Sequence, residues 1–310
     1  MITPDDAIEA IRETGGAQPG FRALHAKGTL YRGEFTATPE ARTLSRAAHL
    51  DGSPVPILIR FSNGSGRPKQ RDGAPGIRGM TVKFTLPNGS TTDVSTQTAK
   101  LFPVSTPDGF VDLMRAMQPS FATPIRVTKL LVTQPKLPIA LVRGGLPKVP
   151  ASYATERYYG LHAFRWLDAA GGSKFVRYHM IPAAGEHYLH LRAARSKVPD
   201  FLTDELSSRL ADGPVRFYYR VQLAGPNDST VDPSAPWNSK TMVTVGTLDI
   251  TAIDTEREKG GDIVVFDPMR VTDGIEPSDD PVLRFRTNAY SASVKLRTGV
   301  DRGAEAPPSP

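Results

Sequence analysis

Cysteine is absent from this chain of 310 residues. Disulfide bonds, iron–sulfur clusters, thiolate metal ligands and cysteine nucleophiles are therefore excluded. The nitrogen ligands that remain are six histidines, at positions 25, 49, 162, 179, 187 and 190.

Long apolar runs and runs of like charge are also absent. The most apolar stretch, residues 127–149, contains Pro135, Pro138 and lysines, so we expect no membrane as a partner. The first residues lack the pattern of a secretory signal or transit peptide, so we expect a cytoplasmic protein. The net charge is +6, but the basic residues are dispersed, which argues against nucleic acid. We expect some arginines to meet an anionic small molecule.

Extended segments dominate the middle of the chain. Turn signals at residues 87–90 and 169–172 join neighbouring segments into hairpins. So many long strands would leave exposed edges unless the sheet closed, so we expect an antiparallel β-barrel. Five segments alternate or are rich in β-branched and aromatic residues: 57–62, 79–86, 173–181, 215–224 and 242–253.

Helices are expected around this barrel. The last of them should begin at Pro281, with Asp280 as its N-cap. The whole pattern predicts the α+β class, with about eight antiparallel strands. We expect an N-terminal arm (1–20), one barrel domain (21–300) and a disordered tail (301–310). The other predicted helices cover residues 5–13, 108–118, 122–143 with a proline break, and 200–210.

A tyrosine near the C-terminus lies between two arginines. Arg286, Tyr290 and Arg297 are spaced i, i+4 and i+11, which places them along one stripe of a helix. Guanidinium groups on both sides favour the phenolate form of the tyrosine. A phenolate is a hard oxygen ligand for ferric iron. The alternative is a solvated helix with an amphipathic tyrosine.

A histidine near the other end of the chain has distinctive neighbours. His25 lies in the motif RALHAKG, three residues after Arg22. A neutral imidazole there could take a proton from one peroxide oxygen and return it to the other. A lone histidine is more often structural, but IRFSNGSG, RGMTVKF and STQTAKLFPV follow it in order.

Six motifs together resemble the haem catalase family, in sequence and in order. The resemblance covers residues 21–297, which is nearly the whole chain. The chain stops just after the helix that carries the tyrosine, so we expect a catalase-like core without the C-terminal helical domain. It is similar in this respect to the minimal, catalase-related peroxidases. The motifs are HAKG, RFS, RGxxVKF, YYGLHAF, DGIEPSDDPVLRFR and RTNAY.

This resemblance implies a cofactor, haem b with ferric iron, and a role for each matching residue. His25 matches the distal histidine, and Ser62 matches the serine that orients it. Tyr290 matches the iron ligand, and Arg286 the arginine that holds it as phenolate. Four more residues match positions that contact the cofactor, as charge-assisted partners of its propionates or as packing on its distal face: Arg22, Arg60, Arg297 and Phe110.

The chain departs from the family at three positions near the expected peroxide site. An asparagine usual in the family is replaced by Gln97, with Thr98 beside it, and a glutamine offers the same donors on a longer arm. Gly64 and Gly76 stand where catalases usually carry a valine and an aspartate. We expect these replacements to widen the approach to the iron and to favour larger peroxides.

Three functions are compatible with these residues. The leading one is a haem peroxidase that reduces hydrogen peroxide or organic hydroperoxides with a small organic donor, with weak catalase activity. The second is a fatty-acid hydroperoxide isomerase, but such enzymes carry threonine before the distal histidine, where this chain has Leu24. The third, a barrel that binds an apolar ligand without redox chemistry, is disfavoured by the ordered motifs. We expect a homo-oligomer, a dimer or a tetramer.

Overall fold

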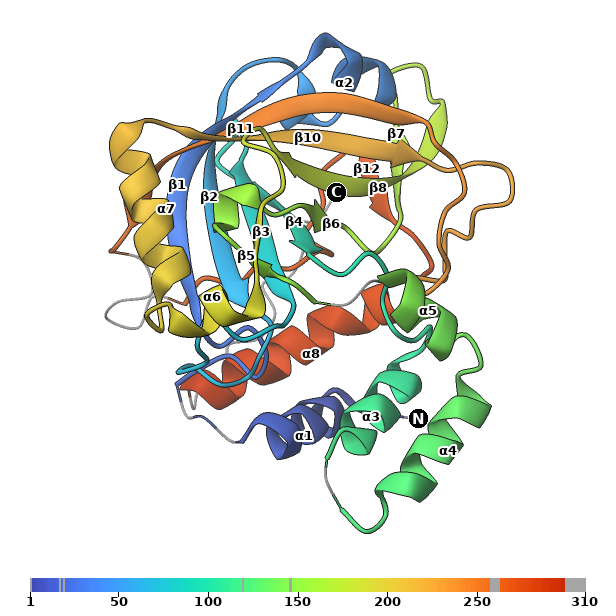
Figure 1. Cartoon of the computed structure of the whole chain (residues 1–310). Coiled ribbons are helices and arrows are strands. Elements are labelled where there is room, and N and C mark those ends of the chain that lie inside the picture. Colours follow the sequence, from blue (N-terminus) through green and yellow to red (C-terminus); the bar gives the residue numbers. More distant parts are fainter. Residues whose placement is uncertain are drawn as a thin grey trace.

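A closed antiparallel barrel forms the centre of the computed structural model, which describes residues 2–16, 18, 20–118, 120–144, 147–256 and 263–298, without side chains for 295–298 (Figure 1). The barrel strands pair in the order β10-β11-β1-β2-β3-β4-β6-β8, and β8 pairs back with β10. The predicted fold is therefore confirmed. The strands are β1 (Gly28–Ala37), β2 (Val55–Asn63), β3 (Arg78–Thr85), β4 (Thr91–Gln97), β6 (Tyr158–Tyr159), β8 (Ser173–Pro182), β10 (Val215–Leu223) and β11 (Met242–Asp254).

Aromatic side chains fill the inside of the barrel. Phe35 on β1 and Phe84 on β3 are fully buried and meet edge to face, with ring centroids 5.1 Å apart. Successive side chains of a strand point to opposite faces, so Phe61 on β2 points inward while Arg60 and Ser62 point outward. Arg60 and Ser62 are nevertheless buried, because the outer face of the strand is covered as well.

Helices supply that cover. Helices α1 and α3 pack against each other and against α8, on one side of the barrel (Figure 1). Among the described residues, no helix has the length and apolarity needed to cross a membrane. The helices are α1 (Pro4–Gly15), α2 (Pro39–Leu44), α3 (Pro107–Ala116), α4 (Thr123–Thr133), α5 (Leu137–Gly144), α6 (Leu191–Ser196), α7 (Phe201–Asp212) and α8 (Pro281–Thr298).

Helix α8 begins where the sequence predicted. Pro281 is its first residue, and the Asp280 carboxylate accepts hydrogen bonds from the backbone N–H groups of Val282 (2.8 Å) and Leu283 (3.2 Å). The second oxygen of the same carboxylate contacts His162.

The predicted segments agree with the observed elements to within a few residues, and the break at Pro135 separates α4 from α5. Strands β1 and β4 were not among the five predicted strand segments. The other missed elements have two to six residues, too few for a readable period. The expected tail, residues 301–310, lies outside the described residues, and the proposed domain boundaries remain a prediction. These other elements are α2, α6, β5 (Val149–Pro150), β6, β7 (Phe164–Leu167), β9 (Tyr188–Leu189), β12 (Ile275–Pro277) and two 3₁₀ turns (Ala48–Leu50 and Tyr153–Thr155).

Candidate functional site

A cavity of about 240 Å³, partly open to solvent, is formed by residues of the barrel's outer face and of helices α1, α3 and α8. Apolar side chains such as Ile11, Phe102 and Phe285 make up much of its wall. Eight of the nine predicted site residues line this cavity: Arg22, His25, Arg60, Ser62, Gln97, Phe110, Arg286 and Tyr290. The side chain of the remaining one, Arg297, lies outside the described part of the chain.

The imidazole of His25 is fixed on the barrel side of the cavity. Its Nδ1 lies 2.9 Å from the hydroxyl oxygen of Ser62. Burial, followed by the positive charges of Arg60 and Arg286, lowers the pKa of His25 to about 3. The ring is therefore neutral near pH 7 and able to accept a proton.

The backbone of His25 is unusual too. With a φ of 55°, His25 is the one non-glycine residue with positive φ among those that the structure describes. Such a conformation is uncommon for a residue with a side chain and needs support from its surroundings.

Two motif glycines make room for the site. A Cβ atom on Gly79 would lie 2.8 Å from the Ser62 hydroxyl and 2.9 Å from Nδ1 of His25. A Cβ atom on Gly28 would lie 2.5 Å from Cζ of Arg60. Both glycines are therefore needed so that the imidazole and the guanidinium can lie directly against strands β3 and β1.

Tyr290 is held by a chain of hydrogen bonds from the helix side. Arg286 donates from Nε to the phenol oxygen at 2.9 Å and donates to the same oxygen from Nη2. Its Nη1 lies 3.0 Å from Nε2 of His162, whose Nδ1 lies 2.6 Å from the Asp280 carboxylate. A guanidinium has no acceptor, so Nε2 accepts and the imidazole proton lies on Nδ1. One tautomer of His162 thus connects Asp280 to Arg286.

Sequence reasoning had not assigned a role to His162. Its motif YYGLHAF was recognised, but the partners Asp280 and Arg286 are 118 and 124 residues away in the chain. Burial lowers the pKa of His162, and the neighbouring Asp280 opposes that shift. The histidine is almost fully buried, so its part is to orient Arg286 and not to meet a substrate.

Two more arginines lie along the barrel wall of the cavity. Arg22 donates to the backbone oxygen of Val264 at 2.7 Å, and Arg60 donates to that of His25 at 3.0 Å. Guanidinium groups recognise carboxylates well because they offer paired donors with a permanent charge. The aromatic ring of Phe110 stacks on Phe102 with centroids 5.7 Å apart.

The structure separates Gln97 from Thr98. Gln97 lines the cavity, whereas the Thr98 hydroxyl accepts a hydrogen bond from the backbone N–H of Arg78 at 3.0 Å. Gly64 and Gly76 are not among the described residues that line the cavity. A Cβ atom at Gly64 would meet the backbone of Ile77 at 3.1 Å. The cavity wall therefore gives no direct sign of the expected widening at these two positions.

The donor set fits a haem. Among the described residues, no group of three or more histidine, aspartate or glutamate side chains could hold a metal ion. A metal held by the phenol of Tyr290 would therefore need its remaining ligands from a bound group. A porphyrin supplies those ligands, its faces match the apolar walls, and its carboxylates match Arg22 and Arg60.

Comparisons with known proteins identify the relatives of this chain. A family model described as Catalase matches residues 17–304. A catalase-related peroxidase from Mycolicibacterium paratuberculosis is 70% identical over 99% of this chain and 98% of the relative. A catalase-related peroxidase from Synechococcus elongatus is 34% identical over 96% of this chain and 89% of the relative.

Solved structures share the fold. A fungal catalase superposes with a TM-score of 0.79 at 21% identity, over 94% of this chain and 61% of the fungal chain. Catalase A from Saccharomyces cerevisiae gives a TM-score of 0.77 at 20% identity, over 94% of this chain and 64% of the yeast chain. This chain therefore spans somewhat less than two thirds of the solved catalases that it matches.

Proposed function

The chain belongs to the catalase family, and we propose that it is a haem-dependent peroxidase. Its substrates are hydrogen peroxide or an organic hydroperoxide, a small organic molecule is the electron donor, and disproportionation of hydrogen peroxide is a weaker side activity. Both near-full-length relatives are named catalase-related peroxidase. We further propose haem b as the cofactor and a dimer or tetramer as the assembly.

One observation carries this proposal. The His25–Ser62 pair and the Arg286–Tyr290 pair, which come from opposite ends of the chain, line the same apolar cavity. In that cavity Tyr290 would be the iron ligand, and Arg22 and Arg60 would hold the carboxylates. Two N–H donors of one guanidinium point at the phenol oxygen, which suits an oxygen that acts as an electron-pair donor.

The residues of the chain supply the proton transfers. When bound, a ferric haem would supply the redox chemistry for cleavage of the O–O bond and for oxidation of the donor. The neutral imidazole of His25 accepts the proton of the peroxide and returns it to the departing oxygen, so that water or an alcohol leaves. Ser62 keeps the ring in place, and the Gln97 carboxamide steadies the peroxide by hydrogen bonding.

Isomerisation of fatty-acid hydroperoxides would use the same haem and is the runner-up. The residue before His25 favours the peroxidase over the isomerase. This residue, Leu24, lines the cavity, whereas fatty-acid hydroperoxide isomerases of this kind carry a threonine at the same position. An apolar side chain cannot donate a hydrogen bond to the substrate. No described contact favours the isomerase, and the barrel without redox chemistry would not need the Arg286–Tyr290 arrangement.

A spectrum followed by steady-state assays tests the proposal. The purified protein should show the intense absorption band of haem at the violet edge of the visible range. It should oxidise an organic donor with either hydrogen peroxide or a bulky hydroperoxide, faster than it releases oxygen. A colourless protein that cannot be reconstituted would exclude all haem functions, and conversion of a lipid hydroperoxide without donor consumption would favour the isomerase.

A further inference from the structure

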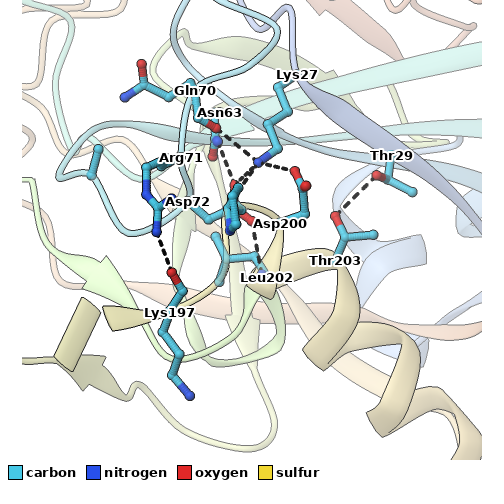
Figure 2. Close-up of polar contacts among 12 residues, drawn as sticks. Lys27, Thr29, Asn63, Gln70, Arg71, Asp72, Lys197, Asp200, Leu202 and Thr203 are labelled. Atoms are coloured by element: carbon cyan, nitrogen blue, oxygen red, sulfur yellow. Dashed lines mark hydrogen bonds and ion pairs between the residues drawn. The ribbon is translucent and has the colours of Figure 1, made fainter. Parts of the chain in front are cut away.

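A lysine two residues after His25 is enclosed by oxygen atoms. Its Nζ lies 2.6 Å from a carboxylate oxygen of Asp72 and 2.6 Å from one of Asp200 (Figure 2). It also donates to the backbone oxygens of Gln70 at 3.0 Å and Pro199 at 2.9 Å. The side chain of Lys27 is only 13% exposed. This one ammonium thus joins the start of β1 to the loop after β2 and to the approach to α7.

Asp72 is the centre of this group. Its carboxylate is fully buried and accepts from Lys27, from the Asn63 carboxamide at 2.9 Å and from the backbone N–H of Leu202 at 3.0 Å. A buried carboxylate is retained only where such donors compensate for its lost hydration. Donors from the residue before β1, from β2 and from α7 therefore converge on one anion, as Figure 2 shows.

The two side chains that Asp72 binds, Lys27 and Asn63, are close in sequence to His25 and Ser62. Asn63 directly follows Ser62, and alternation along β2 turns these two side chains to opposite faces. Lys27 follows His25 by two residues, and its backbone oxygen accepts the N–H of Asn63 at 3.0 Å. Asp72 thus binds, from outside the cavity, the chain segments that carry His25 and Ser62.

We propose that Lys27, Asn63 and Asp72 form a clasp that positions the His25–Ser62 pair for proton transfer. None of the three lines the cavity, so they act through the pair and are positioning residues. His25 has a left-handed backbone conformation, and such a strained conformation persists only where neighbouring contacts stabilise it. The clasp supplies such contacts. This inference rests on the proposed function of His25.

A double-mutant cycle tests the clasp. Lys27→Met and Asn63→Ala should each lower kcat of the haem-loaded enzyme about 10- to 100-fold, because small misplacements of a catalytic group cost that much. Substrate KM should change little. In a His25→Ala background the same substitutions should cost nothing further, because the group they position is gone. Equal losses in both backgrounds, or no loss with His25 present, would overturn the proposal.

Lys83→Met is the matched control. Lys83 is 15% exposed and pairs with the buried Asp93 at 2.8 Å, so it forms a comparable lysine–aspartate pair, between strands β3 and β4. Its loss should lower stability without a kcat effect that depends on His25. Asn63→Ala leaves the Lys27–Asp72 ion pair intact, so it remains available if Lys27→Met fails to fold.

A measurement on the haem-free protein separates this inference from the proposed function. NMR of ¹⁵N-labelled histidines should show His25 in one neutral tautomer in the unmodified chain, because Ser62 binds a single ring nitrogen. In Lys27→Met and Asn63→Ala the ring should average between tautomers. An unchanged His25 signal in both variants would exclude the clasp, whereas failure of peroxidase turnover in the unmodified chain would count only against the proposed function.

Discussion

At the scale of single residues, the protonation of one imidazole decides what the cavity can do. Burial and the surrounding guanidiniums lower the pKa of His25 to about 3, so its basic form is present throughout the neutral range. A positively charged ring could not accept the proton of a peroxide. The arginines near His25 thus have two electrostatic effects. They attract anionic groups, and together with burial they keep the imidazole of His25 uncharged.

Replacing His25 by alanine should therefore remove proton transfer and leave the cofactor in place. We expect kcat for hydrogen peroxide to fall roughly 10²- to 10⁴-fold, the usual contribution of a general acid–base. Stopped-flow and steady-state assays at equal haem content provide the measurement. A variant that keeps more than a tenth of the turnover would contradict the role of His25.

The Tyr290 phenol should matter for the cofactor itself. Tyr290→Phe keeps the ring and removes the oxygen that Arg286 contacts. We expect weaker haem retention or a shifted visible spectrum, because the iron would lose its protein ligand. Absorption spectra and haem content after gel filtration give the answer. Tyr188→Phe, outside the cavity, is the control, and identical spectra for all three proteins would refute the ligand assignment.

At the scale of elements, the first turn of α8 joins stability to the site. One oxygen of Asp280 caps the helix through Val282 and Leu283, and the other binds His162. Helix α8 therefore cannot shift along its axis without breaking the path from Asp280 to Arg286. The carboxylate of Asp280, which the sequence indicated as the N-cap, is therefore also the partner of His162.

Asp280→Ala should lower the free energy of unfolding by more than the loss of an ordinary helix cap does. Loss of a cap costs about 1 kcal/mol, and a buried group left without its partner costs about 1–3 kcal/mol, so we expect roughly 2–4 kcal/mol of unfolding free energy. Urea titrations of the haem-free protein measure this. Asp279→Ala, next to it and highly exposed, should change little. Equal effects at both positions would show that the bond to His162 contributes nothing.

At the scale of the whole molecule, buried histidines make the fold sensitive to acid. Burial lowers the pKa of His25 to about 3 and the pKa values of His49 and His179 to about 4, and it also lowers that of His162. Unfolded histidines titrate near ~6.5. Between pH 6.5 and 4 these four histidines bind more protons in the unfolded chain than in the folded one, so their contribution to stability falls as the pH falls through this window. Glu156 opposes them in part, because burial raises its pKa to about 7.

His49 isolates part of this effect. It is buried against Phe84, and its Nδ1 has no hydrogen-bond partner, so leucine can replace it without breaking a bond to that atom. His49→Leu should make the loss of stability below pH 6 shallower by up to about 1.4 kcal/mol per pH unit. Urea titrations at pH 7, 6 and 5 check this, with His190→Leu as the exposed control. An unchanged pH slope would contradict the buried, neutral state of His49.

The sequence by itself determined five of the long strands, the start of α8 and the nine candidate site residues, because these follow from local periodicity, capping and motifs. Only the tertiary structure decided which distant groups meet. The pairing of β8 with β10 closes the barrel, and Asp72 and His162 each join segments more than 100 residues apart. Such contacts have no local sequence signal, because their stabilising free energy comes from burying and pairing groups that only the fold brings together.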